Sequence, residues 1–405
     1  MKERAMSINK IYCRVFQAVF NIGARLLRWR RPIAVSGEGS TGRLPGILKA
    51  ENSKKPLIVT GPNVRRILLP GILVELESGG IEYKIFSEVE NDPTSETCGR
   101  IRDMYISSGC DSFIAVGGGS PMDAAKGAAA LAARPGKSIS QLSGLLKVGR
   151  RIPTFIAIPT TAGTGSETTI AAVITDAETH HKAAVMDLHL IPKYAVLDPL
   201  LTVGLPPKTT AATGMDALTH GVEAYLCWTY NTKESIRLAE EAIADIFKYL
   251  ERAYNDGGDI EAREKMLIAS YKAGFAFTRA GVGNVHAIAH TLGGLYGTAH
   301  GLANAVILPI VLEDYGSRVY RKLARLAAIV GIKGETEEKL AAGFIAEIRD
   351  MNRRMGIPTG FPFIKEEDIE TMIIWALAVA NPVYPVPVVY DRERCRRVIE
   401  KIRNS

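Results

Sequence analysis

Short apolar runs alternate with helical periods through the first half of the chain, and this alternation constrains the fold more than any other feature. Four runs suit buried parallel strands: Pro56–Thr60, Tyr83–Phe86, Phe113–Val116 and Phe155–Ile158. Helical periods lie between them, near residues 63–79, 95–109 and 120–134. A β-α-β alternation of this kind predicts a doubly wound α/β sheet. Further strands or a hairpin are expected near residues 170–175, 182–186 and 194–197.

The pattern changes after Leu205, where two prolines follow in sequence. From Lys208 to the end, the chain reads as successive helices with few β-rich runs. Proline ends elements, and Pro207 can open a helix because its missing N–H is not needed in the first turn. A chain of 405 residues is also too long for one ordinary domain. We therefore expect three parts: an amino-terminal extension over 1–32, a dinucleotide-binding α/β domain over 33–205 and an all-helical domain over 206–405.

A glycine-rich turn leaves one predicted strand and enters a predicted helix. The turn consists of Gly117, Gly118, Gly119 and Ser120. Glycines allow backbone N–H groups to approach an anion, and the helix amino terminus adds partial positive charge. Ser120 is expected to cap the helix, with Pro121 in the first turn and Asp123 completing a capping-box-like pair. A tight structural turn is the alternative, but the placement favours binding of a pyrophosphate.

A second loop, residues 159–167, follows the Phe155–Ile158 run and is rich in glycine and hydroxyl side chains. It contains Thr160, Thr161 and Thr164. Its backbone and hydroxyl groups can reach a ribose or a phosphate. Beside the glycine turn, from an adjoining strand, this loop is expected to form the second wall of one nucleotide site. Lys182 either neutralises phosphate charge there or is a solvated surface lysine.

Acids and histidines recur at helical spacing in the second half of the chain. Asp216 and His220 are four residues apart, as are His286 and His290, so each pair shares one helix face. His300 follows alone. A carboxylate with neutral imidazoles is a ligand set for zinc or iron(II). Scattered core histidines are the alternative, but the remaining three histidines lie in another stretch, so the cluster favours a metal centre.

The net charge of +7 belongs to the amino-terminal extension. Residues 1–31 contain eight lysines and arginines and one acid, and the remaining 374 residues carry equal numbers of each sign. This location argues against a nucleic-acid partner. The apolar residues of the extension recur at roughly helical spacing, which predicts a basic amphipathic helix. That helix either packs on the body or serves a membrane surface, a partner or a compartment; it lacks the features of a secretory signal.

Cysteine usage and hydropathy indicate a cytoplasmic, globular protein. The five cysteines are odd in number and never form C-x-x-C, so they are expected to be isolated thiols in a reducing compartment. No run of about 18 uncharged apolar residues is present, so no transmembrane segment is expected.

Four motifs, in this order, resemble the iron-containing (group III) alcohol dehydrogenases. They are Gly117–Lys126, Pro159–Glu167, Thr213–His220 and the histidine series at 286, 290 and 300. The resemblance covers about residues 33–405. It implies a Rossmann-like dinucleotide-binding domain followed by a helical metal-binding domain, the plan shared with dehydroquinate synthase, and an active site in the cleft between them. It also implies a homo-oligomer, by family habit a dimer.

The same resemblance assigns roles residue by residue. Asp216, His220, His286 and His300 match the metal ligands, and His290 matches a non-ligand active-site histidine. Gly118, Gly119 and Ser120 match the pyrophosphate-binding turn, and the three threonines match the loop beside the cofactor. Gly61 stands where relatives often carry an aspartate that binds the adenosine ribose, so both NAD and NADP remain open, with acceptance of NADP(H) expected.

The implied reaction is hydride transfer between NAD(P)(H) and a short-chain primary alcohol or aldehyde. Iron(II) or zinc polarises the substrate oxygen, and the nicotinamide carries the hydride. His290 either relays the alcohol proton near neutral pH or is structural. A glycerol- or diol-type dehydrogenase of the same superfamily is the first alternative, and a noncatalytic metal- and nucleotide-binding protein is the second. Dehydroquinate synthase would need many basic residues within 208–310, which are not present.

Overall fold

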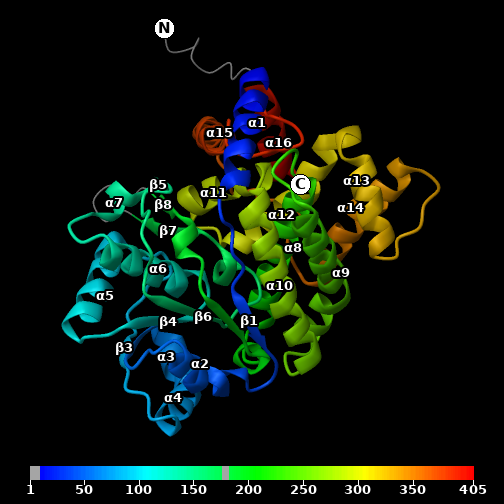
Figure 1. Cartoon of the computed structure of the whole chain (residues 1–405). Helices are drawn as coiled ribbons and strands as arrows, with labels where there is room; N and C mark the ends of the chain where they lie inside the picture. The colour runs from blue at the N-terminus through cyan, green and yellow to red at the C-terminus, as the bar shows by residue number, and fades with distance from the viewer. Residues whose placement is uncertain (1–9, 176–181) are drawn as a thin grey trace. The chain divides into compact units, whose positions relative to one another are not determined.

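The computed structural model describes residues 10–175 and 182–405, except for the side chains of residues 182 and 183 (Figure 1). The chain divides into two compact units. One comprises the segment that ends at Leu27 together with Leu205–Gly257 and Phe275–Ser405, and the other comprises Arg28–Gly204 and Gly258–Gly274. The predicted ranges differ in two respects: the extension belongs with the helical unit, and residues 258–274 belong with the α/β unit. Among the described residues, no helix is both long and apolar enough to cross a membrane.

A six-stranded sheet forms the centre of the α/β unit. Its strands, in spatial order, are β1 (Ile33–Ser36), β9 (Tyr194–Leu197), β6 (Thr154–Pro159), β4 (Ser112–Gly117), β2 (Pro56–Val59) and β3 (Lys84–Phe86). Every neighbouring pair is parallel. The four predicted strands are therefore confirmed. The run near 194–197 joins this same sheet, and the edge strand β1 was not predicted.

Helices cover both faces of this sheet. They are α2 (Leu44–Ala50), α3 (Pro62–Ile67), α4 (Leu69–Ser78), α5 (Ser95–Ser107), α6 (Gly119–Ala133) and α7 (Ile139–Leu142). Successive residues of a strand point to opposite faces. Leu57 and Phe113 accordingly belong to a core that includes residues of α5 and α6, whereas Ile58 and Ile114 belong to a core that includes residues of α2 and α4. Burial on both faces explains why these strands are continuous apolar runs.

A second, three-stranded sheet completes the α/β unit. Its order is β5 (Gly144–Leu145), β8 (Lys182–Met186) and β7 (Ala171–Thr175), and β7 pairs with β8 in antiparallel register. The expected hairpin is therefore present. Short 3-10 helices connect elements of the chain: η2 (Ser40–Arg43), η3 (Ser166–Thr168), η4 (Leu188–Leu190), η5 (Pro199–Thr202) and η6 (Gly316–Arg318).

The second unit is helical. Its helices are α1 (Lys10–Leu26), α8 (Pro207–Leu226), α9 (Lys233–Asn255), the end of α10 (Ile260–Ala280), α11 (Asn284–Tyr296), α12 (His300–Tyr315), α13 (Tyr320–Ile329), α14 (Glu337–Arg354), α15 (Glu366–Ala380) and α16 (Arg392–Asn404). Pro207 is the first residue of α8, as expected for a proline that opens a helix. Helix α1 packs on this unit, where Cys13, Gln17 and Ala24 are buried. All five cysteines are free and buried, which confirms the expected isolated thiols.

Candidate active site

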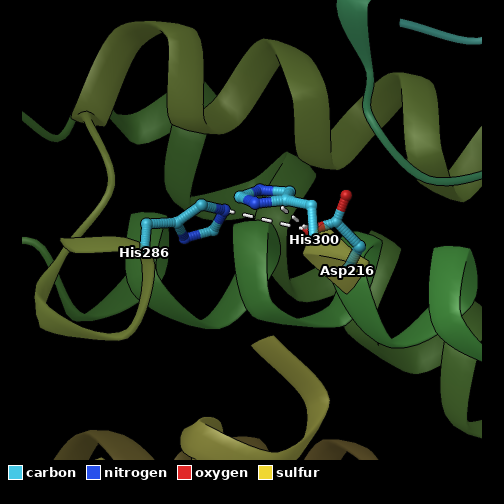
Figure 2. Close-up of side chains that lie close together, drawn as sticks. All are labelled: Asp216, His286 and His300. Carbon is cyan, nitrogen blue, oxygen red and sulfur yellow. Dashed lines mark ion pairs between the residues drawn. The ribbon is translucent and has the colours of Figure 1, made fainter. Parts of the chain in front are cut away.

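Asp216, His286 and His300 each direct one ligand atom toward a common point (Figure 2). All three atoms lie within 4.8 Å of one another. Oδ1 of Asp216 is 3.9 Å from Nε2 of His286 and 3.7 Å from Nε2 of His300. The three side chains come from α8, α11 and the first residue of α12. The separations of 3.7 and 3.9 Å between Asp216 and the two imidazoles fit an ion about 2.0–2.2 Å from each donor.

The close approach of α12 to α8 depends on Gly301. A Cβ atom at that position would lie 2.2 Å from the carbonyl oxygen of Ala212 and 3.3 Å from Cβ of Asp216. Real Cβ atoms do not approach a carbonyl oxygen this closely, so any side chain at residue 301 would push the helices apart. The glycine that follows His300 thus keeps the imidazole within reach of the Asp216 carboxylate.

His220 lies beside these three residues, one turn after Asp216 on α8. Its ring is buried and stacks on His286, with 4.6 Å between ring centroids, and on Phe277, with 4.1 Å. The group of three converging donors comprises Asp216, His286 and His300. The role of His220 as a fourth ligand therefore stays a prediction, although the fold brings it next to the other three residues.

Glu223 fixes the orientation of His286, and sequence reasoning missed it. Its carboxylate accepts hydrogen bonds from the backbone N–H groups of Gly283 and Val285, each at 2.8 Å, and from Nδ1 of His286 at 2.5 Å. A carboxylate on Nδ1 leaves Nε2 of the imidazole as the ligand atom. Burial raises the pKa of Glu223 to about 7, against the opposing effect of the two backbone N–H groups. Glu223 lies seven residues after Asp216 and therefore on the same face of α8, and this spacing could have identified it from the sequence.

The electrostatics favour the protonation states that bind a cation. Burial alone would raise the pKa of Asp216, but the imidazoles of His220, His300 and His286 and the Asn304 amide outweigh it and lower that pKa. Burial, with the neighbouring imidazoles, lowers the pKa of His286 well below its ordinary value. An ionised carboxylate and a neutral imidazole are the forms that metal binding requires.

Asn304 is a second residue that the sequence analysis missed. Its amide nitrogen lies 2.7 Å from Oδ1 of Asp216 and 3.2 Å from Nε2 of both His286 and His300. The amide nitrogen therefore lies where the three donor atoms converge. The amide oxygen is buried and has no hydrogen-bond partner among residues 10–175 and 182–405. A half-turn of this amide would direct the oxygen, a metal-binding atom, toward the same point. Its position four residues after His300 was the available signal.

His290 is exposed, one turn after His286 on α11. Its ring stacks on that of His300, with 5.4 Å between centroids, and lies edge-on to that of His286 at 6.2 Å. The ring therefore lies both near the converging donors and at the surface of this unit. Such a position suits a group that exchanges protons with solvent, and its role in the reaction stays a prediction.

The glycine turn has the predicted place between β4 and α6, but its capping differs from the prediction. Helix α6 begins at Gly119, and Gly118 is its N-cap without a side-chain hydrogen bond. Ser120 therefore already lies in the first turn, where its hydroxyl donates to the carbonyl oxygen of Asn91, so its expected role as cap is wrong. Asp123 is also no capping residue: it is half-buried and accepts from Oγ of Ser166 at 2.9 Å and from the Val173 N–H at 3.1 Å. Gly117 has a φ of +148°, a conformation that favours glycine.

The structure brings the glycine turn and the threonine loop together. The N–H of Thr160 donates to the carbonyl oxygen of Gly117 at 3.0 Å. A Cβ atom on Gly118 would lie 3.3 Å from Oγ1 of Thr161, and one on Gly119 would lie 3.4 Å from Cγ2 of Thr164. Glycine at these two positions therefore leaves backbone N–H groups accessible next to threonine side chains. Binding of a nucleotide by this pair of loops stays a prediction.

Lys126, which the sequence analysis did not single out as a site residue, joins α6 to the threonine loop. It is fully buried, and Nζ donates to the carbonyl oxygens of Ser166, Thr169 and Ala171 at 2.7, 3.1 and 3.0 Å. The hydroxyl oxygens of Ser166 and Thr169 lie 3.2 and 2.8 Å from Nζ and share its three N–H groups with these carbonyl oxygens. Burial lowers the pKa of Lys126 to about 8, against the attraction of Asp123 and Glu167. Lys126 is a single cationic residue in an otherwise alanine-rich helix, and this pattern could have marked it in the sequence as a buried lysine with partners.

Gly61 and Lys182 complete the predicted cofactor residues. Gly61 is the N-cap of α3 and is extended, with a φ of −96°, and a Cβ atom there would lie 3.2 Å from the carbonyl oxygen of Val89. Arg65 and Arg66 lie on the same helix. The backbone of Lys182 belongs to β8, but its side chain lies outside the described part of the chain.

Comparison with known proteins agrees with this arrangement. Residues 32–199 match the iron-containing alcohol dehydrogenases, and residues 210–402 match the C-terminal part of the Fe-containing alcohol dehydrogenase family. The NAD-dependent methanol dehydrogenase of Bacillus methanolicus is 37% identical over 84% of this chain and 90% of that protein. The NADPH-dependent butanol dehydrogenase of Clostridium saccharobutylicum is 36% identical over 80% of this chain and 82% of that protein. A crystal structure of 1,3-propanediol oxidoreductase superposes with a TM-score of 0.89 at 33% identity, over 93% of this chain and 99% of that chain. The chain therefore belongs to the iron-containing alcohol dehydrogenase family.

Proposed function

We propose that Asp216, His220, His286 and His300 bind one divalent ion at which a short-chain primary alcohol and its aldehyde are interconverted. The protein is an NAD(P)-dependent oxidoreductase of the iron-containing family, which sets the reaction class. The observation that supports this location is the convergence of three donor atoms within 4.8 Å. The bond from His286 to Glu223 supports it further, because it leaves Nε2 as the free ligand atom.

The side chains of the centre have separate tasks. When bound, the divalent cation supplies Lewis acidity at the substrate oxygen, and the nicotinamide ring takes or gives the hydride. Asp216 supplies the one negative charge among the proposed ligands, so a net positive charge of about one is retained to polarise that oxygen. Glu223 holds the His286 ring in place. His290 takes up the alcohol proton and passes it to solvent, in keeping with its exposed position beside His300.

We assign cofactor binding to the glycine turn and the threonine loop. Backbone N–H groups at Gly118 and Gly119, with the amino terminus of α6, bind the pyrophosphate. Thr160, Thr161 and Thr164 line the same point, and Asp123 with Lys126 positions the loop rather than touching the cofactor. The relatives include one named for NAD and one named for NADPH, so their names do not decide between the two cofactors.

We infer a cytoplasmic homo-oligomer. Five free, buried thiols are typical of a reducing compartment. The dimer rests on the family resemblance, and analytical ultracentrifugation of the purified protein measures it directly.

The test is removal of single ligands. His286→Ala and His300→Ala should each lose the bound metal and the alcohol-dependent reduction of NAD(P), because the three remaining donors hold an ion far less tightly than all four. His189→Ala is the matched control, since that imidazole pairs with Asp187 in the other unit. Metal is measured by mass spectrometry and turnover by absorbance of the reduced nicotinamide. Full turnover in metal-free His286→Ala would overturn the proposal.

A diol-type dehydrogenase is the second candidate, favoured by the likeness to 1,3-propanediol oxidoreductase. A panel of methanol, ethanol, butanol, 1,3-propanediol, glycerol and lactaldehyde, with both cofactors and with iron(II) or zinc, separates the candidates. The highest kcat/KM on a diol would favour the second candidate. The highest kcat/KM on butanol or ethanol would favour the first.

A further inference from the structure

Helix α1 presents two opposite faces of different character. Five large apolar side chains form a stripe along its outer face: Ile11, Val15, Val19, Ile22 and Leu26. Their exposed fractions run from 56% for Val15 to 81% for Leu26. Spacings of three and four residues place them in one row on a helix. By the rise of an α-helix the row is about 23 Å long. Isolated exposed apolar residues are ordinary, but a continuous row is a mark of an interaction surface.

The inner face of α1 holds the helix on the helical unit. The Arg14 guanidinium donates to the carbonyl oxygens of Val386 and Pro387 at 2.8 and 2.9 Å and lies over the ring of Trp228. Nε2 of Gln17, which is fully buried, donates to the carbonyl oxygens of Pro382 and Tyr384. These contacts fix which residues face outward. The apolar stripe is therefore not the surface through which α1 packs on its own unit.

Positive charge gathers at the carboxyl end of the stripe. Arg25 lies in the last turn of α1, and Arg28 and Arg31 follow it in the chain, whereas the Arg30 guanidinium donates to the carbonyl oxygen of Ile191 in the α/β unit. Arg279 donates to the carbonyl oxygen of Ala24, which adds another cation near Arg25. Over residues 1–31, eight basic residues face one acid, while the rest of the chain is neutral. An apolar stripe on a basic helix is the pattern of helices that lie in the interface of anionic bilayers.

The positive charge of residues 1–31 favours a lipid surface over a second copy of the chain as the partner of the stripe. Two copies that paired through this stripe would bring two strongly basic segments together, and like charges at short range repel. An anionic bilayer instead offers opposite charge for the arginines and an apolar boundary for the stripe. We propose that α1 docks this protein on an anionic membrane surface, with the stripe at the acyl boundary and Arg25 and Arg28 at the headgroups. This inference is independent of hydride transfer, because α1 contributes no residue to the proposed active site.

Sedimentation with lipid vesicles tests the proposal on the full chain. The protein should sediment with vesicles of phosphatidylglycerol and phosphatidylcholine and remain in the supernatant with phosphatidylcholine alone. The bound fraction should fall when salt is raised from about 0.05 to 0.5 M, because the arginine contribution is screened. The double variant Val15→Asp/Val19→Asp should lower the partition coefficient by about tenfold or more, since two apolar side chains no longer enter the bilayer. Arg25→Glu/Arg28→Glu should weaken binding and reduce its salt dependence.

Controls separate docking from misfolding and from self-association. Val74→Asp/Ile106→Asp replaces two apolar residues of similar exposure on α4 and α5 and should leave vesicle binding unchanged. Alcohol-dependent turnover in solution should be the same in all variants, which shows that they fold. Absence of the unmodified protein from anionic vesicles overturns the proposal. If the stripe variants instead lower the molar mass in analytical ultracentrifugation and leave vesicle binding unaffected, the stripe is an interface between copies and the proposal fails.

Discussion

The Nδ1 atom of His286 lies 2.5 Å from a carboxylate oxygen of Glu223, and both groups are buried. The same carboxylate accepts two backbone hydrogen bonds from the first residues of α11 and the loop before it, at Val285 and Gly283. When Nδ1 carries the proton, all three of these groups are donors, and an ionised carboxylate accepts from them together. Glu223 thereby fixes the position of α11, the rotamer of His286 and the tautomer that leaves Nε2 without a proton.

Glu223→Gln should weaken metal binding by about 10–100-fold with little change in size of the side chain. The NH2 group of the glutamine side chain would point at N–H groups that now donate to the Glu223 carboxylate. At least one of those hydrogen bonds would be lost. Glu167→Gln is a matched control, because Glu167 is an equally buried glutamate whose pKa burial also raises to about 7. Competition with a chelator measures affinity for iron(II) and zinc. Equal affinities in Glu223→Gln and the unmodified protein would contradict this role.

Gly61→Asp should shift the ratio of kcat/KM values toward NAD(H) by about tenfold, or about 1.4 kcal/mol. A carboxylate there bonds the ribose hydroxyls and repels a 2′-phosphate. The extended backbone of Gly61 accepts a side chain, although its Cβ must shift slightly from the Val89 carbonyl oxygen at 3.2 Å. Gly61→Ala adds the Cβ without the charge and should leave the ratio near its original value. Strict preference for NAD(H) in the unmodified protein would show that another residue reads the ribose.

Glu167 should make the stability of the α/β unit depend on pH. Burial raises its pKa from an ordinary 4.5 to about 7, so the folded state holds a proton that the unfolded state has released between these values. The contribution of Glu167 to the free energy of unfolding is therefore fully present below pH 4.5 and lost as the pH rises through 7. Glu167→Gln removes this loss, so it should gain stability relative to the unmodified protein as the pH is raised from about 5 to 8. The unfolding midpoints of Glu167→Gln and the unmodified protein, measured by calorimetry at both pH values, give this difference in stability, with the exposed Glu82→Gln as control. A difference between the two proteins that does not change with pH would refute the assignment.

Gln17→Met should lower the free energy of unfolding by about 1–3 kcal/mol, because it leaves the Pro382 carbonyl oxygen without its Gln17 donor and removes one of the two donors to the Tyr384 carbonyl oxygen. Turnover per folded molecule should not change. Ala18→Ser, on the exposed neighbouring position, should leave stability within about 0.5 kcal/mol. Urea titrations followed by circular dichroism provide the measurement. Unchanged stability in Gln17→Met would mean that α1 is not held by this pair of bonds.

The sequence predicted the central strands because β2, β4 and β6 are buried on both faces and therefore appear as unbroken apolar runs. The edge strand β1 has only four residues, and Ile33 is half exposed, so it lacks that pattern. The misplaced cap at Ser120 has a similar cause. A serine before a helix resembles a cap in sequence, whereas the structure starts the helix at Gly119, two residues earlier than a cap at Ser120 would.

The rule of helical spacing grouped Asp216 with His220 and His286 with His290, and the metal-ligand chemistry of these side chains, not their spacing, was the reason to expect the two faces and His300 to converge. Glu223 and Asn304 extend the same faces by one turn, so that rule, applied further, would have found them. The contacts of Lys126 were beyond such rules. Its partners are mainly backbone carbonyl oxygens of a segment some 40 residues later, and the identity of a residue carries no information about where its carbonyl oxygen points.

The buried ammonium group of Lys126 has a consequence for how the α/β unit moves. Neither α6 nor the segment from Ser166 to Ala171 can open alone, because the separation would leave a charge in the interior without acceptors. The two should therefore open together, as one cooperative unit of local unfolding. In native-state hydrogen exchange, amides at the start of α6 and in η3 should share one opening free energy. If the loop from a relative replaced this one to change the choice of cofactor, its backbone carbonyl oxygens would have to accept from Lys126, or the lysine would have to be replaced as well.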